Sequence, residues 1–220
     1  KEKVNPLAGG TDLLVNMKKG DQSPPHVLSL GRIDALRGIK KLKNHLSIGA
    51  TARAEEISKT PTVNHDFRAF RQGAGSLGSP LIRNLATIGG NLVNASPAAD
   101  AAPPLLVYDA DVLLVQDSGE RWLPLAEFFA GPGQTALSSV EILKDIRLPL
   151  SARRTAAAFS KLGKRRAMAI AVVSAAVRLT LAEDGRIAAA RIALGSVAPR
   201  PLRARGAENV LTGRPVNDAL

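Results

Sequence analysis

The clearest hydrophobic pattern lies in the last third of the chain, where alanine and β-branched residues dominate two long runs. Residues 169–181 and 187–196 are therefore predicted to be long strands. Between them stands Glu183-Asp184-Gly185, and an Asp-Gly pair favours a tight hairpin. We predict an antiparallel hairpin here, followed by a helix at residues 201–211 that closes at Gly213.

Earlier residues alternate less regularly and predict shorter elements. Lys18 and Lys19 suit the last turn of a short helix, and Gly20 suits its stop. Thr51 can cap a helix that Pro61 ends. The remaining predicted elements are a strand end at 7–10, a helix at 11–19, a strand at 45–49, a helix at 66–72, strands at 111–116 and 121–125, and an alternating segment at 140–148.

Two regional features indicate how the chain is organised. Residues 73–100 contain five glycines and two prolines, so we expect a loop-rich segment that carries most of the chemistry. The texture of the sequence changes beyond Ser151. We therefore place a domain boundary near residue 150, with one domain at 1–150 and a second at 151–220.

Composition excludes several function classes. The chain has no cysteine, which rules out disulfides, thiolate zinc sites and iron–sulfur ligation within it. Its three histidines are far apart, so a metal site is not expected. The net charge is +11, but the basic residues are dispersed and aromatics are only 3%, which favours a solvated basic surface over nucleic-acid binding. With no signal peptide and no apolar run as long as a membrane span, we expect a cytoplasmic protein.

A first candidate ligand loop is Ala8-Gly9-Gly10-Thr11-Asp12-Leu13, between a strand and a helix. Paired glycines let the backbone turn sharply and bring N–H groups toward an anion. Thr11 adds a hydroxyl donor, whereas Asp12 more plausibly caps the helix or braces the loop. Taken alone, the segment is better explained as a plain turn.

A second loop, Thr87-Ile88-Gly89-Gly90-Asn91, repeats a threonine, two glycines and a short polar residue. Two such loops indicate the two sides of one pyrophosphate clamp. Asp100, a little further on, could accept hydrogen bonds from sugar or ribityl hydroxyls, or could instead cap a helix at residues 101–106.

A third glycine motif is a decoy. Gly73-Ala74-Gly75-Ser76-Leu77-Gly78 formally matches the dinucleotide fingerprint, which requires a strand before it and a helix after it. A helical pattern precedes this run and a loop with Pro80 follows, so we reject the fingerprint.

Taken together, these spaced motifs resemble the FAD-binding subunit of the molybdenum hydroxylases, the family of CO, xanthine and aldehyde dehydrogenases. The resemblance rests on Ala8-Gly-Gly-Thr-Asp-Leu-Leu, Gly78-Ser-Pro-Leu-Ile-Arg-Asn and Thr87-Ile-Gly-Gly-Asn with Asp100. Glu127-Phe-Phe and Leu194-Gly-Ser-Val-Ala-Pro-Arg extend it over essentially the whole chain.

The resemblance implies an α+β fold of the vanillyl-alcohol-oxidase (PCMH) type, with two subdomains holding FAD, followed by a small α+β C-terminal domain. Both glycine loops would hold the pyrophosphate and Asp100 the ribityl or ribose portion. Leu143 would pack on the flavin, Lys161 would place a cation near it, and Leu77 sits where relatives carry an aromatic. The implied cofactor-binding residues are Leu7, Ala8, Gly9, Gly10, Thr11, Asp12, Leu13, Leu77, Thr87, Ile88, Gly89, Gly90, Asn91, Asp100, Leu143 and Lys161.

The family also implies a function and partners. Electrons from a molybdenum cofactor on a large subunit would pass through [2Fe–2S] clusters on a small subunit to FAD on this chain, and then to NAD or a quinone. The assembly would be a dimer of heterotrimers. FAD would be bound non-covalently, since neither loop contains histidine. The alternatives are a free-standing FAD-dependent reductase, with Tyr108 or Ser160 as candidate proton donors, and a basic interaction module without cofactor.

The sequence departs from the family pattern at several points. Leu81 replaces a glutamine, and Ala167 and Met168 stand where some relatives carry acids. Segments that family members have before the first loop and after the last helix are missing, so both domains are expected to be truncated. Lys164, Arg165 and Arg166 form a cationic group that is either a solvated turn or an attractor for an anionic electron acceptor.

Overall fold

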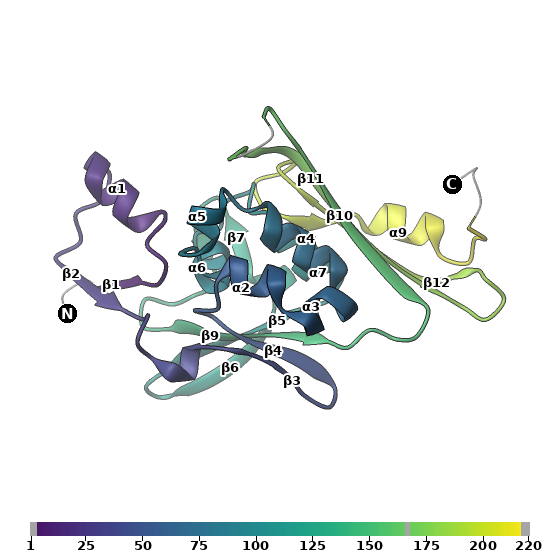
Figure 1. Cartoon of the computed structure of the whole chain (residues 1–220), viewed down its shortest axis with the longest axis horizontal. Helices are drawn as coiled ribbons and strands as arrows, with labels where there is room; N and C mark the ends of the chain where they lie inside the picture. Colours follow the sequence, from purple (N-terminus) through teal and green to yellow (C-terminus); the bar gives the residue numbers. More distant parts are fainter. Residues whose placement is uncertain (1–3, 166–167, 217–220) are drawn as a thin grey trace.

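The computed structural model describes residues 4–165 and 168–216, and it places a layer of helices between two antiparallel sheets (Figure 1). The mixed α and β architecture expected from the sequence is confirmed. Among the described helices, none is both long enough and apolar enough to cross a membrane.

A small lobe at the N-terminus stands to one side of these layers (Figure 1). It contains β1 (Val4–Leu7), α1 (Leu13–Lys19) and β2 (His26–Ser29), and β1 pairs with β2 in parallel. As predicted, α1 ends at Gly20, whose φ of 84° is the left-handed conformation that glycine accepts at little cost.

The first sheet has five antiparallel strands in the order β3-β4-β9-β5-β6. These are Ile39–Lys41, His45–Gly49, Ile142–Pro149, Asp111–Gln116 and Gly119–Pro124. Alternate residues on its inner face, such as Ile48, Val112 and Ile146, are fully buried against the helices. The predicted strands at 45–49, 111–116 and 121–125 are confirmed to within two residues at each end, as is most of 140–148.

The helical layer lies mainly in the first half of the chain. It comprises α2 (Ala54–Lys59), α3 (Pro61–Asp66), α4 (Arg68–Ser76), α5 (Pro80–Arg83), α6 (Ile88–Val93), α7 (Ala102–Val107) and α8 (Leu125–Phe128), after a 3-10 turn, η1 (Asp34–Leu36).

One expectation about this layer was correct only in part, and a second was wrong. Residues 73–100 were expected to be loop-rich but contain the end of α4 and all of α5 and α6. Helices this short are too brief to show a period, and their small residues pack closely. Thr51 does not cap α2, because its hydroxyl donates to the Leu36 carbonyl at 2.7 Å and Arg53 holds the N-cap position.

The rejected dinucleotide fingerprint lies mostly inside α4, so its rejection is confirmed. Gly73 is required for close packing, since a β-carbon there would come within 2.6 Å of the Asp100 carbonyl oxygen.

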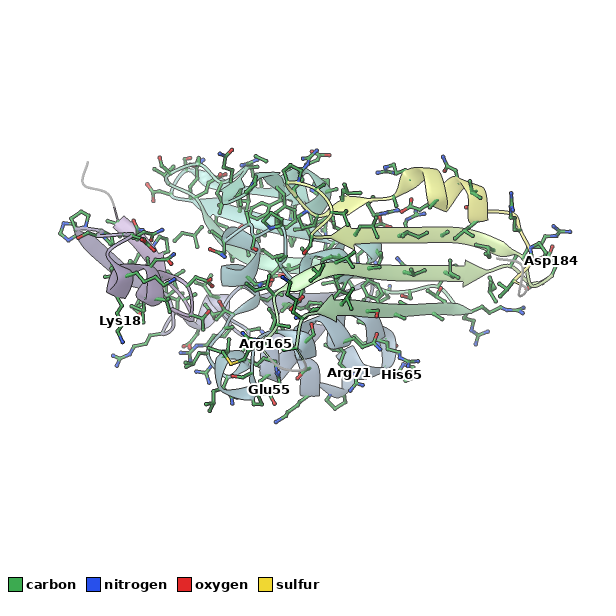
Figure 2. All side chains as sticks on the ribbon, turned by 90° about the horizontal axis from the view of Figure 1, so that it is seen from above. Lys18, Glu55, His65, Arg71, Arg165 and Asp184 are labelled. Carbon is green, nitrogen blue, oxygen red and sulfur yellow. The ribbon has the colours of Figure 1, made fainter. Side chains whose placement is uncertain are left out.

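The second sheet has the order β10-β11-β12-β13 and packs on α4 and α7. Its strands are Thr155–Gly163, Ala171–Leu181, Ile187–Gly195 and Leu202–Arg203, followed by α9 (Arg205–Leu211). The predicted Asp-Gly hairpin between β11 and β12 is confirmed, with Gly185 at φ 84° and Asp184 at the end of the two strands (Figure 2). The predicted last helix begins four residues late, because β13 occupies its start. Two further short strands are β7 (Phe129–Gly131) and β8 (Gln134–Thr135).

Candidate functional site

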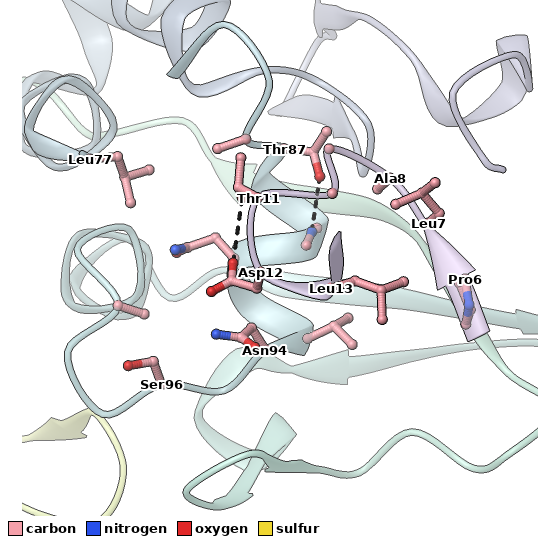
Figure 3. Close-up of a pocket in the computed structure, with 18 of the residues that line it drawn as sticks. Pro6, Leu7, Ala8, Thr11, Asp12, Leu13, Leu77, Thr87, Asn94 and Ser96 are labelled. Atoms are coloured by element: carbon pink, nitrogen blue, oxygen red, sulfur yellow. Dashed lines mark hydrogen bonds between the residues drawn. The ribbon is translucent and has the colours of Figure 1, made fainter. Parts of the chain in front are cut away.

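A large cavity, of about 750 Å³, opens between the N-terminal lobe, the helical layer and the start of β9 (Figure 3). All of the sequence-predicted site residues line it except Ile88 and Lys161. Those that line it are Leu7, Ala8, Gly9, Gly10, Thr11, Asp12, Leu13, Leu77, Thr87, Gly89, Gly90, Asn91, Asp100 and Leu143. The structure thus brings together segments that lie more than a hundred residues apart.

The first glycine loop lines this cavity and has unused backbone donors. Within the described part of the chain, the N–H groups of Gly9, Gly10 and Thr11 donate to no protein acceptor. Gly10 has a φ of +73°, and a β-carbon at Gly9 would overlap the Leu85 carbonyl oxygen. Both glycines are therefore needed to seat the loop. A surface of free N–H groups is suited to an anion.

Asp12, at the end of this loop, braces it instead of capping α1. It occupies the N-cap position, but its carboxylate makes no bond to the helix backbone. The Thr11 hydroxyl donates to that carboxylate at 3.4 Å (Figure 3).

The second glycine segment is built differently from the expected loop of bare N–H groups. The N–H groups of Ile88 and Gly89 donate to the carbonyls of Ala52 and Ala50 at 2.9 and 2.8 Å. The Thr87 hydroxyl caps α6 by accepting the Gly90 N–H at 3.2 Å. These donors are already used within the protein, so the expectation was wrong for this segment. Ile88 is 1% exposed and belongs to the core.

Two buried oxygens on the cavity wall have no partner. They are Asn91 Oδ1 and Asp100 Oδ1, and neither accepts a hydrogen bond from any described residue. Because buried polar atoms are normally paired, unpaired ones in residues that line a cavity favour a ligand with matching donors. The Asn91 amide can also present its nitrogen, since the two ends of an amide are nearly isosteric.

Asp100 forms a buried ion pair with Lys161 that was not foreseen from the sequence. Lys161 Nζ lies 2.5 Å from Asp100 Oδ2, and the side chains are 13% and 6% exposed. Lys161 also donates to the Ser76 carbonyl at 3.1 Å. Burial raises the pKa of Asp100, and the neighbouring Lys161 partly offsets that increase. The capping alternative for Asp100 is wrong, because α7 begins after Ala101 without a side-chain cap.

A second cavity, of about 730 Å³, lies on the other side of this ion pair. It shares Gly78, Met168 and Ala169 with the first cavity. Among the described residues, four cationic side chains line it: Arg83, Lys161, Lys164 and Arg165. Arg166 and Ala167, also singled out in the sequence, lie outside the described residues.

Sequence reasoning missed an acidic residue at the edge of the large cavity. The carboxylate of Glu141 accepts two hydrogen bonds from Arg121, from Nε at 2.7 Å and from Nη2 at 2.9 Å. It also accepts one from the Ser138 N–H at 2.9 Å. Arg121 holds the pKa of Glu141 at about 2. Twenty residues separate the pair, so no local pattern could have revealed it.

Comparison with known families decides what this cavity belongs to. Residues 1–151 match the family described as the FAD binding domain in molybdopterin dehydrogenase. Residues 157–220 match the CO dehydrogenase flavoprotein C-terminal domain. The chain belongs to the FAD-binding subunits of the molybdenum hydroxylases. The family indicated by the sequence motifs is thereby confirmed.

Individual relatives support this assignment of the FAD-binding subunit. The nicotinate dehydrogenase FAD-subunit of Eubacterium barkeri is 33% identical over 96% of this chain and 72% of its own length. The putative xanthine dehydrogenase FAD-binding subunit of Escherichia coli K12 is also 33% identical, over 96% of this chain and 73% of its own length. The structure of carbon monoxide dehydrogenase from Hydrogenophaga pseudoflava superposes with a TM-score of 0.93 at 32% identity, covering 98% of this chain and 75% of that one.

The chemistry of the cavity suits FAD. Its volume is within the range of about 300–1,000 Å³ typical of cofactor sites. Free N–H groups at the first loop match a pyrophosphate, and the unpaired carboxylate oxygen of Asp100 matches a hydroxyl donor. Leu77 and Leu143 offer apolar surface to a flat ring.

Proposed function

We propose that this subunit transfers electrons from a partner's iron–sulfur clusters, through non-covalent FAD in the large cavity, to an external acceptor. The proposal rests on two kinds of group among the residues that line the cavity, hydrogen-bond donors on one segment and acceptors on others. Unused donors stand at Gly9, Gly10 and Thr11, and unpaired acceptors stand at Asn91 and Asp100. A ligand with an anionic centre and a hydroxylated chain complements both sets.

In this arrangement the first loop donates to the pyrophosphate, and the second segment contributes packing and the Asn91 amide. Asp100 Oδ1 accepts from a ribityl or ribose hydroxyl, while Oδ2 stays with Lys161. Leu77 and Leu143 pack against the ring system. Lys161 places its charge behind Asp100, where it favours the ionised carboxylate and partly offsets the rise in pKa that burial causes.

FAD supplies the redox chemistry when bound, and the chain supplies position and electrostatics. A free-standing reductase would need a proton donor beside the flavin. The two candidates do not line the large cavity: Tyr108 is 1% exposed within the core, with a pKa raised to about 12 by burial, and Ser160 lies on the second cavity. This placement favours an electron-transfer subunit over the reductase alternative.

The remaining chemistry belongs to partners in this proposal. A chain without cysteine holds no iron–sulfur cluster itself, so the [2Fe–2S] clusters and the molybdenum cofactor reside on small and large partner subunits. We further propose a dimer of heterotrimers in the cytoplasm and a division of this chain near residue 150. The matched families at 1–151 and 157–220 support that division.

The basic turn at Lys164 and Arg165 supports an anionic acceptor such as NAD over a neutral quinone. Both residues line the second cavity, which shares a wall with the proposed flavin site. Neither has an acidic partner among the described residues, so their charge is available to attract an anion.

Two measurements test the proposal. Acid precipitation of the yellow protein should release flavin into the supernatant, and flavin retained in the pellet would contradict non-covalent attachment. Affinity purification from the native host, with metal analysis, should recover partners that contain molybdenum and iron. A chain that purifies alone with full reductase activity would support the free-standing alternative.

A further inference from the structure

The short helix α5 borders the proposed FAD site, although none of its residues is fully buried. It lies on the wall between the two cavities, since Ile82 lines the first and Arg83 the second, and its outward residue Leu81 is 79% exposed. With only four residues it contributes little stability of its own. Ser79 caps the helix by accepting the Ile82 N–H at 3.3 Å, and a contact with a neighbouring helix is needed to fix its position.

The position of α5 controls both proposed FAD contacts around it. Leu77 and Gly78, immediately before it, line the large cavity. The carbonyl oxygen of Leu85, two residues after it, packs so closely on Gly9 of the first loop that a β-carbon there would overlap it. Any displacement of α5 would therefore move the ring-side wall and the support of the first loop together.

Arg83 supplies the anchor. Its Nε donates to Glu55 Oε2 of α2 at 2.7 Å, and its Nη1 donates to the Leu77 carbonyl at 3.3 Å. Both charged side chains are partly buried, Arg83 at 17% and Glu55 at 15% exposure. The other oxygen of Glu55 pairs with Lys59, which is 73% exposed. Arg83 is the principal cause of the lowered pKa of Glu55. One planar guanidinium thus ties α2, α5 and Leu77 together, which a single ammonium does less well.

We propose that Arg83, held by Glu55, is a positioning residue for FAD. It does not touch the cofactor cavity itself but fixes the wall of that cavity through Leu77 and the support of Gly9 through Leu85. This inference rests on the proposed placement of FAD in the large cavity.

The test is the FAD dissociation constant of flavin-free protein, measured by quenching of flavin fluorescence. Arg83→Gln is expected to weaken FAD binding about tenfold, the loss that corresponds to one charged hydrogen-bonded link. Glu55→Gln should cause a similar loss. The double variant should lose no more than either single variant, because both changes remove the same link. Lys59→Gln is the matched control, and it should bind FAD as the wild type does.

Additional readouts separate positioning from general destabilisation. Circular dichroism of the bound flavin should change in Arg83→Gln, while the denaturant midpoint of its flavin-free form stays close to that of wild type. Arg83→Lys, which keeps the charge beside Glu55 without a second prong, should give an intermediate dissociation constant even if the glutamine variants fold poorly.

Three results would overturn the inference. They are wild-type FAD affinity in Arg83→Gln, additive losses in the double variant, and an equal loss in Lys59→Gln. If the wild-type protein itself bound no FAD, the proposed function would fail first, and that outcome is distinct from a wild type and variants that bind equally.

Discussion

Replacing Lys161 with methionine tests the buried ion pair behind the proposed cofactor. The substitution keeps the length of the side chain but removes its charge from Asp100, which is only 6% exposed. Removing one partner of a buried pair typically costs about 3–5 kcal/mol, because the remaining charge stays buried without compensation. We therefore expect the flavin-free Lys161→Met protein to lose about 3 kcal/mol of unfolding free energy at neutral pH.

The pH dependence of that loss has a definite sign. Burial already raises the pKa of Asp100 in the folded protein, and removal of Lys161 raises it further. A carboxyl whose folded pKa lies above its unfolded value stabilises the folded state at low pH, and this stabilisation is lost as pH rises through the folded pKa. The variant should consequently approach wild type at acidic pH and fall furthest behind it at neutral pH.

Urea unfolding of both flavin-free proteins at about pH 5 and pH 7.5 measures this difference. Adding Asp100→Asn to Lys161→Met should restore most of the stability, because no charge then remains buried, but it should not restore FAD affinity. A loss below about 0.5 kcal/mol, or a loss that does not change with pH, would refute the reasoning.

Three further predictions follow from other parts of the site. Gly90→Ala should leave the fold intact, since φ is not positive there and Thr87 Oγ1 is the only close neighbour of a β-carbon among the described residues. Gly89→Ala should unfold more readily, because its β-carbon would lie 2.7 Å from Ala50. Denaturation midpoints and flavin content of the two variants check this contrast, and equal midpoints would contradict it. Changing Lys164 and Arg165 to alanine should slow the reoxidation of reduced flavin by NAD, measured by stopped flow. It should also weaken the salt dependence of that rate, because charges are screened over about 10 Å at 0.1 M salt. An unchanged rate would mean that the turn does not attract the acceptor. Arg121→Gln should destabilise the protein at neutral pH but not near pH 2. The stability that comes from the lowered pKa of Glu141 is present above its unfolded value of 4.5 and is lost as pH falls through about 2. A difference in unfolding free energy that stays constant with pH would argue against this.

Much of the proposed site could be predicted because its signals are local. Gly9, Gly10 and Thr11 lie in one short segment, and the need for glycine where the backbone must turn sharply is visible in the sequence. The hairpin at Gly185 was predictable for the same reason. Leu143 and Lys161 came only from the family resemblance, since nothing around them distinguishes them from other core or surface residues.

What could not be predicted depends on contacts between distant segments. The strand β9 lies between β4 and β5, Asp100 pairs with Lys161, and Glu55 anchors α5. These contacts join residues 27 to 104 positions apart. The second glycine segment was misread for a related reason. Its N–H groups are used by the carbonyls of Ala50 and Ala52, and only the folded chain brings these together.

Amide hydrogen exchange with and without FAD tests the central claim most directly. The account predicts that the N–H groups of Gly9, Gly10 and Thr11, which have no acceptor among the described residues, exchange rapidly in the flavin-free protein and become protected when FAD binds. The N–H groups of Ile88 and Gly89, already bonded to carbonyls, should be protected in both states. Unchanged exchange at Gly9–Thr11 in protein saturated with FAD would contradict the placement of its pyrophosphate in this cavity.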